Sequence, residues 1–269
     1  MRIAPDVAVG LRLALRARFV SISFWLMVSV LGVAWMAAQF SGRQPATVAL
    51  DVGLSVIRLA LPVIGILLLQ ELVSREFDRR LFLTSLTYPR PRHRFLLGRL
   101  LSVGALLAAL LVALGASLSA LVAWLAAGYD QATPVALGWP YWLTLCFVLV
   151  DLFVILAMGA LLAVVAVTPS FVLIGTLGFM LVARSFSTIV QMLQRQTWLV
   201  QDAETYSSSL GVLGYLLPDL AALDVRMIAL YGQMNLLPTQ WPWHLAGALA
   251  YGVALVGLAV WALKRRRIA

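Results

Sequence analysis

The sequence predicts an all-α, polytopic membrane protein, and three observations lead to that fold class. Hydrophobic residues make up 62% of the 269 positions and charged residues only 12%, against about 45–50% and about 25% in soluble domains. Six apolar stretches are each long enough to cross a bilayer as a helix, which takes about 20 residues. Basic residues gather in 1–18, in 73–99 and in the carboxyl tail. Such a distribution of basic residues is typical of the cytoplasmic loops and ends of a membrane protein. Nucleic acid is therefore not an expected partner despite the net charge of +9.

The six predicted spans follow in order along a single transmembrane domain, residues 1–269. Residues 1–18 are expected to form an interfacial lead-in helix. The first apolar run is longer than the apolar core of a signal peptide, which has about 7–15 residues. We therefore expect this run to remain in the protein as a span. The predicted spans are Phe19–Phe40, Val52–Val73, Phe95–Ala127, Tyr141–Val167, Phe171–Val190 and Trp243–Leu263.

The positive-inside rule orients these spans. The three segments on the expected outer side contain only Arg43, Arg195 and Arg226, whereas the other loops and the two ends hold most of the basic residues. Six crossings then place both termini in the cytoplasm with the basic loop. We therefore expect N-in/C-in topology.

The basic loop between the second and third spans, with a predicted cytoplasmic coupling region at 74–94, contains a helical pattern. Apolar side chains at Leu81, Phe82, Leu86 and Tyr88 share roughly helical spacing, and Pro89 ends the pattern. Arg79 and Arg80 begin it. By composition alone, such a helix either rests on lipid headgroups or docks onto a partner protein.

Three ionisable residues lie inside predicted spans: Arg58, Asp151 and Arg184. Helix geometry places the two arginines roughly 10 Å deep, within snorkelling reach of the surface, and Asp151 near ~15 Å. A carboxylate at that depth requires protonation or a partner. We expect Asp151 to pair with Arg58 or Arg184, either as a structural pair or along a transport route.

The segment 191–241 is expected on the outer side as re-entrant or surface-lying helices. It holds two semi-apolar pieces, Leu210–Leu217 and Leu220–Tyr231, separated by Pro218 and Asp219. Both pieces are too short to span. We expect Asp219, Asp224 and Arg226 on the wet face and Leu220, Leu223, Ile228 and Leu230 on the buried one. The segment could act as a cap over the bundle or as a gate.

Several kinds of chemistry are missing from the sequence. Its two histidines, His93 and His244, are too few for a histidine metal cluster within one chain, so no metal site is expected. The only lysine is Lys264, followed by arginines, which rules out a phosphate-binding loop. We therefore predict no catalytic residue, no cofactor and no enzymatic activity in this chain alone.

Residues Leu72–Leu101 resemble the permease subunits of ABC-2 type transporters, also called type V exporters. The matching features are the acidic residues around Glu76, the short helix Leu81–Leu86, the proline-arginine turn at 89–92, and the entry Leu96-Leu97-Gly98-Arg99. The stretch from Leu216 to Gly232 and the arginine-rich tail are also similar. Many members have Glu-Gly-Thr before the short helix, where this chain has Arg79-Arg80-Leu81.

The resemblance implies a permease that exports a substrate, pairs with a second copy of itself and contacts membrane lipids. It also implies two cytoplasmic ATPase subunits that hold ATP and Mg, coupled through a helix made of Arg79, Arg80, Leu81, Phe82, Leu86, Tyr88 and Pro89. The expected location is the bacterial cytoplasmic (inner) membrane, as a multi-pass protein. Two other function classes stay open: a non-transporting membrane anchor for a soluble partner, and an intramembrane enzyme.

Overall fold

The structure, a computed structural model, describes residues 7, 10–12, 19–74, 92–128, 134–166, 168–195 and 217–265. The predicted coupling helix from Arg79 to Pro89 lies outside these residues. So do most of the lead-in segment 1–18 and the piece from Leu210 to Leu216.

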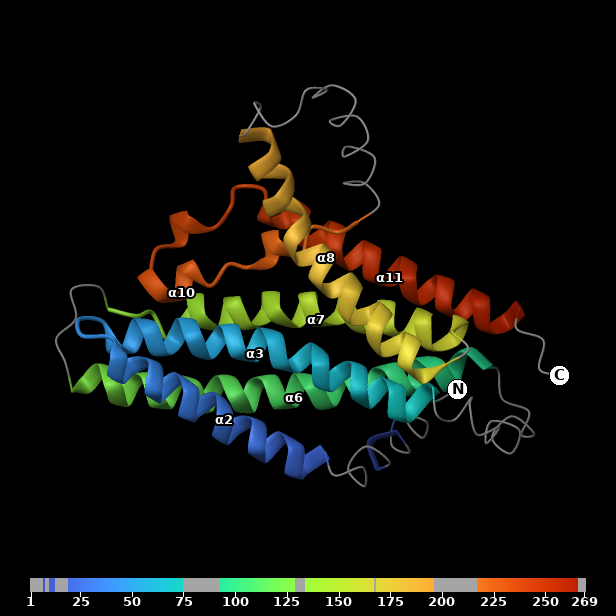
Figure 1. Cartoon of the computed structure of the whole chain (residues 1–269), viewed down its shortest axis with the longest axis horizontal. Helices are drawn as coiled ribbons and strands as arrows, with labels where there is room; N and C mark the ends of the chain where they lie inside the picture. Colours follow the sequence, from blue (N-terminus) through green and yellow to red (C-terminus); the bar gives the residue numbers. More distant parts are fainter. Residues whose placement is uncertain are drawn as a thin grey trace.

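Every regular element in the described part of the chain is helical. Five helices are long and apolar enough to cross a membrane, which makes this a multi-pass membrane protein. The long helices are α2 (Phe19–Phe40), α3 (Pro45–Leu69), α6 (Arg92–Ala127), α7 (Trp139–Val165), α8 (Pro169–Arg195) and α11 (Trp241–Arg265). Figure 1 shows α2, α3, α6 and α7 running lengthwise beside one another.

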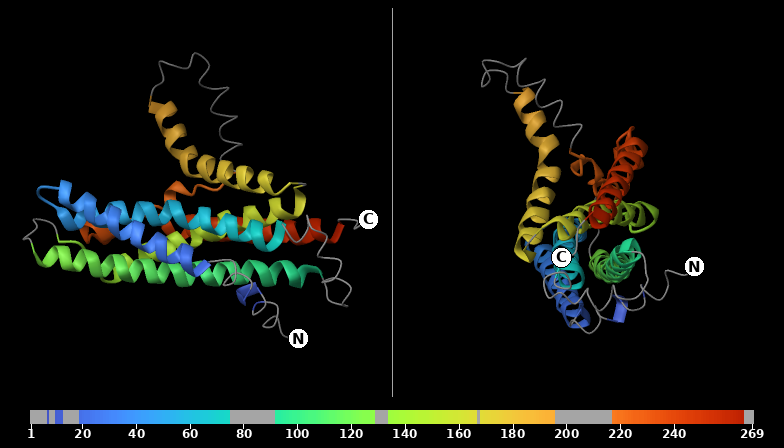
Figure 2. Two further views of the ribbon diagram at one scale, coloured as in Figure 1. Left: turned by 60° about the horizontal axis from the view of Figure 1, so that its bottom comes forward. Right: turned by 90° about the vertical axis from the view of Figure 1, so that its right-hand side faces the viewer.

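The fifth predicted crossing, Phe171–Val190, corresponds to α8, which differs from the other long helices. Its apolar part, Pro169–Ser185, is shorter than the helices that qualify as spans. Figures 1 and 2 show that the first part of α8 follows the bundle and that its Arg195 end points away from it. The helix itself continues past the apolar part to Arg195.

Proline decides where two of the helices begin. The second predicted span was expected to start at Val52 after a polar turn, but α3 starts seven residues earlier, at Pro45. Pro45 occupies the first turn, where a missing N–H breaks no helical hydrogen bond. Pro140 does the same at the start of α7. Asp51 therefore lies on a helix rather than in a turn.

The centre of the bundle is formed by α3, α6 and α7. Of the most apolar stretch in each helix, 61% is buried in α7 but only 17% in α2. Gly65 allows α3 to approach its neighbours closely, because it has no side chain. A Cβ at this position would lie only 2.8 Å from Leu107 of α6 and 2.8 Å from Leu156 of α7. The Tyr141 hydroxyl of α7 donates a hydrogen bond of 2.6 Å to the Gly115 carbonyl of α6.

Two ends of the bundle can be distinguished by sequence. We call the end with Ser74, Arg92 and Arg265 the basic end, and the end with the turn Ser41–Gln44 and the N-terminus of α7 the short-turn end. The chain leaves α3 through a π-helical turn, Gln70–Ser74, and re-enters at Arg92. The Ser102 hydroxyl of α6 donates to the Val7 carbonyl over 3.0 Å, which ties part of the N-terminal segment to α6 near the basic end.

Residues 217–240 pack against the bundle towards the short-turn end (Figure 1). They form η3 (Ala221–Leu223), α10 (Met227–Tyr231) and η4 (Met234–Leu236). The expectation of one helical piece from Leu220 to Tyr231 was wrong, because the backbone opens at Asp224, with φ −82° and ψ 84°. Gly232 ends α10 in the left-handed region at φ 67°, which glycine adopts without a Cβ clash.

The buried face of this segment contains the side chains expected there. Leu220, Leu223, Ile228 and Leu230 are all buried. The segment is also joined to the α6–α7 connection, since the Ala136 amide donates a 3.0 Å hydrogen bond to the Ala229 carbonyl. Residues 217–231 are called the outer segment below.

Candidate functional site

The three intramembrane charges named from the sequence lie together. Asp151, on the central helix α7, is 1% exposed, and one of its oxygens, Oδ2, receives an ion-pair contact from Nη2 of Arg184 on α8. The same oxygen lies 3.7 Å from Nε of Arg58 on α3. Asp151 therefore pairs with both arginines rather than with one of them.

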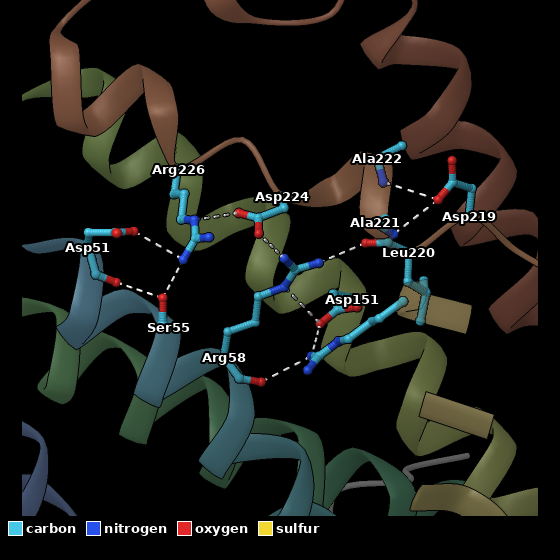
Figure 3. Close-up of polar contacts among 11 residues, drawn as sticks. Asp51, Ser55, Arg58, Asp151, Asp219, Leu220, Ala221, Ala222, Asp224 and Arg226 are labelled. Carbon is cyan, nitrogen blue, oxygen red and sulfur yellow. Dashed lines mark hydrogen bonds and ion pairs between the residues drawn. The ribbon is translucent and has the colours of Figure 1, made fainter. Parts of the chain in front are cut away.

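Arg58 makes its other contacts with the outer segment. Its Nη1 forms an ion pair with Asp224, and its Nη2 donates a 2.7 Å hydrogen bond to the Leu220 carbonyl. Figure 3 shows the Arg58 side chain extending from α3 between Asp151 and these two groups. The side chain is only 14% exposed, so it is held by protein partners and does not snorkel.

Arg184 ties α8 to both neighbouring helices. Besides Asp151, its Nη2 donates to the backbone carbonyl of Arg58 over 3.0 Å. One guanidinium thus holds α3, α7 and α8 at a single point. Its side chain is 16% exposed, so this contact is largely shielded from solvent.

A second group of charges lies nearer the surface. Arg226 of the outer segment places Nη1 3.0 Å from Oδ1 of Asp51 and Nε 3.6 Å from Oδ1 of Asp224. It also donates to the Ser55 hydroxyl, which in turn donates to the Asp51 carbonyl over 2.7 Å. Figure 3 shows that Asp224 lies between Arg226 and Arg58 and contacts both, which joins this group to the contacts of Arg58.

Together these residues form one charge network that alternates in sign. Its order is Asp51, Arg226, Asp224, Arg58, Asp151, Arg184. Three carboxylates balance three guanidiniums, so the network is formally neutral. Neutrality matters because an uncompensated charge in this apolar setting is strongly unfavourable.

Some hydrogen-bonding capacity in the buried half of the network is unused. Oδ1 of Asp151 and Nε of both Arg58 and Arg184 are buried with no hydrogen-bond partner. Buried polar atoms are nearly always satisfied in native proteins. These three atoms are the unsatisfied hydrogen-bonding groups of the buried half of the network.

Asp224 and Arg226 do not form the wet face of the outer segment that was expected from the sequence. Asp224 and Arg226 are only 28% and 35% exposed, and both turn towards α3. The reason is electrostatic: Arg58 and Asp51 on α3 offer opposite charges. Asp219, after Pro218, lies outside the network, and its Oδ1 accepts from the Ala221 and Ala222 amides at 3.1 and 3.2 Å.

Sequence reasoning missed two members, Asp51 and Ser55, because Asp51 was assigned to a turn. A signal was available: Asp51, Ser55 and Arg58 are spaced by four and three residues, which puts them on one face of a helix. Nothing in the sequence, however, indicated which residues would face them.

The arrangement consists of ion pairs and of hydrogen bonds from arginine side chains to backbone carbonyls. The described residues contain no group of three His, Cys, Asp or Glu side chains able to hold a metal ion. A cavity of about 670 Å³ lies elsewhere, between the α2–α3 turn and the end of α6, and includes Gln39, Ser41 and Trp124 among its lining residues. The network is therefore the candidate site of the described region.

Comparison with known proteins leaves the family open. No protein-family model matches the chain, and no curated protein matches it.

Proposed function

We propose that this chain is the membrane-spanning permease subunit of an ABC-2 type transporter. In this proposal the transporter exports its substrate and is driven by a separate cytoplasmic ATPase. The observation that carries the proposal is the arginine-rich connection between α3 and α6, with its leucine-rich motif, proline turn and Leu96-Leu97-Gly98-Arg99 entry. The absence of a phosphate-binding loop from the sequence supports placing ATP and Mg in a partner.

The packing of α3 and α6 supports a mechanical role for that connection. Both helices belong to the centre of the bundle, and Gly65 lets α3 approach Leu107 of α6 closely. A displacement applied between Ser74 and Arg92 would therefore move two central helices together. Because α3 also carries Arg58, the same movement would reach the charge network.

The proposed topology has six crossings, with α8 as the fifth and the basic end in the cytoplasm. The apolar part of α8, Pro169–Ser185, is shorter than the other five spans. The helix exceeds the ~30 Å hydrocarbon layer only with the residues that follow it, up to Arg195. Excess basic residues at the Ser74 and Arg265 end support its cytoplasmic placement. The proposed location is the bacterial cytoplasmic membrane.

The working assembly in this proposal has two copies of the chain and two ATPase subunits. Each coupling helix, Arg79 to Pro89, contacts one ATPase, with Phe82 and Leu86 filling an apolar groove. These assignments follow from the resemblance of Leu72–Leu101 to ABC-2 permeases.

The decisive experiment is co-purification with the candidate ATPase and measurement of ATP turnover. Changing Phe82→Asp together with Leu86→Asp is expected to release the ATPase or to abolish coupling, since a charge in an apolar groove loses its hydration. Thr84→Asp, in the same short helix, is the matched control and should retain the complex. Intact assembly and turnover in the double variant would contradict the docking role.

A topology measurement tests the cytoplasmic placement of the coupling helix, which the transporter and the membrane anchor share. In a Cys146→Ser background, Ser85→Cys should react with reagents only from the cytoplasmic side and Ser41→Cys only from the outer side. A complex that binds an ATPase yet moves no substrate would instead identify a membrane anchor.

A further inference from the structure

The long helices by themselves do not balance the buried half of the charge network. Arg58 on α3 and Arg184 on α8 face a single carboxylate, Asp151 on α7. Asp51 is also on α3, but it lies seven residues from Arg58, roughly 10 Å along the helix, and is paired with Arg226. The helices alone therefore leave one buried positive charge without an anion.

The missing anion comes from the outer segment. Asp224 contacts Nη1 of Arg58, and the Leu220 carbonyl accepts from Nη2. Two of the three guanidinium nitrogens are thus bound by a segment that consists of short helical turns, none long enough to span. Because the Leu220 carbonyl is a backbone group, Arg58 is released from the outer segment completely only when the backbone of that segment moves.

The arginines also hold donors that Asp224 does not use. Nε of Arg58 and Nε of Arg184 are buried without a hydrogen-bond partner. A guanidinium presents its donors in a planar fork that suits the oxygens of a carboxylate or phosphate. Oδ1 of Asp151, also unpartnered, would accept from a hydroxyl carried beside such an anion.

We propose that Arg58 and Arg184 form a binding site for the phosphate or carboxylate head group of an acidic amphiphile, and that Asp224 occupies it as an internal, displaceable counterion. Exchange of one anion for another keeps the buried charge balanced. Movement of the outer segment is thereby linked to ligand binding, since each favours the other. The inference rests on the proposed function only in treating the ligand as a substrate, because binding requires no ATPase.

The test measures binding of phosphatidylglycerol, labelled on an acyl chain, to the purified full-length protein in detergent without an ATPase. Asp224→Asn removes the internal competitor and is expected to lower the Kd about ten-fold, within the range typical of coupled sites. Asp219→Asn is the matched control: it removes an equal charge five residues away that caps the η3 amides and does not touch Arg58. Its Kd should equal that of the unchanged protein.

A second variant and two further ligands complete the experiment. Arg58→Gln should weaken binding about ten-fold or more, and phosphatidylcholine with the same acyl chains should compete poorly. If inorganic phosphate at millimolar concentration prevents lipid binding completely, the site accepts a free oxyanion and the amphiphile assignment is overturned. If Asp224→Asn and Asp219→Asn change the Kd equally, or neither changes it, the internal-counterion proposal is overturned.

The two proposals fail separately in this design. Loss of ATPase association would refute the transporter while leaving the lipid Kd values unchanged. In Asp224→Asn, Arg58 keeps its contact with Asp151, and size-exclusion chromatography checks that the variant is folded. The comparison of Asp224→Asn with Asp219→Asn remains valid even where Arg58→Gln does not accumulate.

Discussion

Arg58 in the charge network and Arg265 at the basic end have the same side chain in different environments. Arg58 is 14% exposed and is surrounded by Asp151, Asp224 and the Leu220 carbonyl. Arg265, at the basic end, is exposed and lies over the Trp261 ring, 4.3 Å from its centroid. The comparison teaches that a charge among apolar helices requires ionic partners, whereas a charge at a helix end is satisfied by solvent and one aromatic face.

The strongest challenge to this comparison is the loss of Asp151. Asp151→Asn leaves Arg184 with no carboxylate partner and Arg58 with only Asp224. We expect a loss of about 3–5 kcal/mol in stability, the range for breaking a buried ion pair. Thermal unfolding followed by circular dichroism in detergent would measure it.

The control for Asp151→Asn is a double variant that keeps the net charge of the network at zero. The double variant Asp151→Asn with Arg184→Gln removes one charge of each sign and should recover much of the lost stability. Equal destabilisation of the single and double variants would mean that shape, rather than charge balance, governs this part of the bundle.

An intermediate effect is expected for the half-buried part of the network. Arg226→Gln breaks contacts with Asp51 and Asp224, whose side chains are 44% and 28% exposed. Solvent screens these pairs, so we expect a loss of at most about 1 kcal/mol. Denaturant titration gives the value, and raising the salt concentration should reduce the difference between the variant and the unchanged protein.

The smallest effect is expected at the basic end. Arg265→Gln removes the contact with Trp261, and an exposed cation–π pair contributes about 0.5–1 kcal/mol. The same unfolding measurement should therefore barely separate this variant from the unchanged protein. An effect as large as that of Asp151→Asn would remove the distinction between the two regions.

Much of the helical layout followed from local pattern. The first helix has the predicted bounds, Phe19–Phe40, and the last differs by two residues at each end, Trp241–Arg265 against Trp243–Leu263. Long apolar runs are this informative because a bilayer requires a continuous helix of nearly fixed length. The buried face of 220–230 also followed from its spacing.

Boundaries next to polar residues were less predictable. Asp51 suggested a turn, yet Pro45 starts α3 well before it. In the outer segment, the apolar spacing of Leu220–Tyr231 suggested one helix, whereas Asp219 closes a short turn and Asp224 adopts an open backbone that reaches Arg58. Tertiary partners outweighed helix propensity at these positions.

By itself the sequence determined the membrane class, the extents of most helices, the basic end and the need of Asp151 for a partner, because hydropathy and charge act over neighbouring residues. Only the tertiary structure decided which charges meet: Arg58 with Leu220, 162 residues apart, and Arg226 with Ser55, 171 residues apart. No local pattern encodes such distances along the chain. They are set by how α3, α7 and α8 pack and by the requirement that buried charges sum to zero.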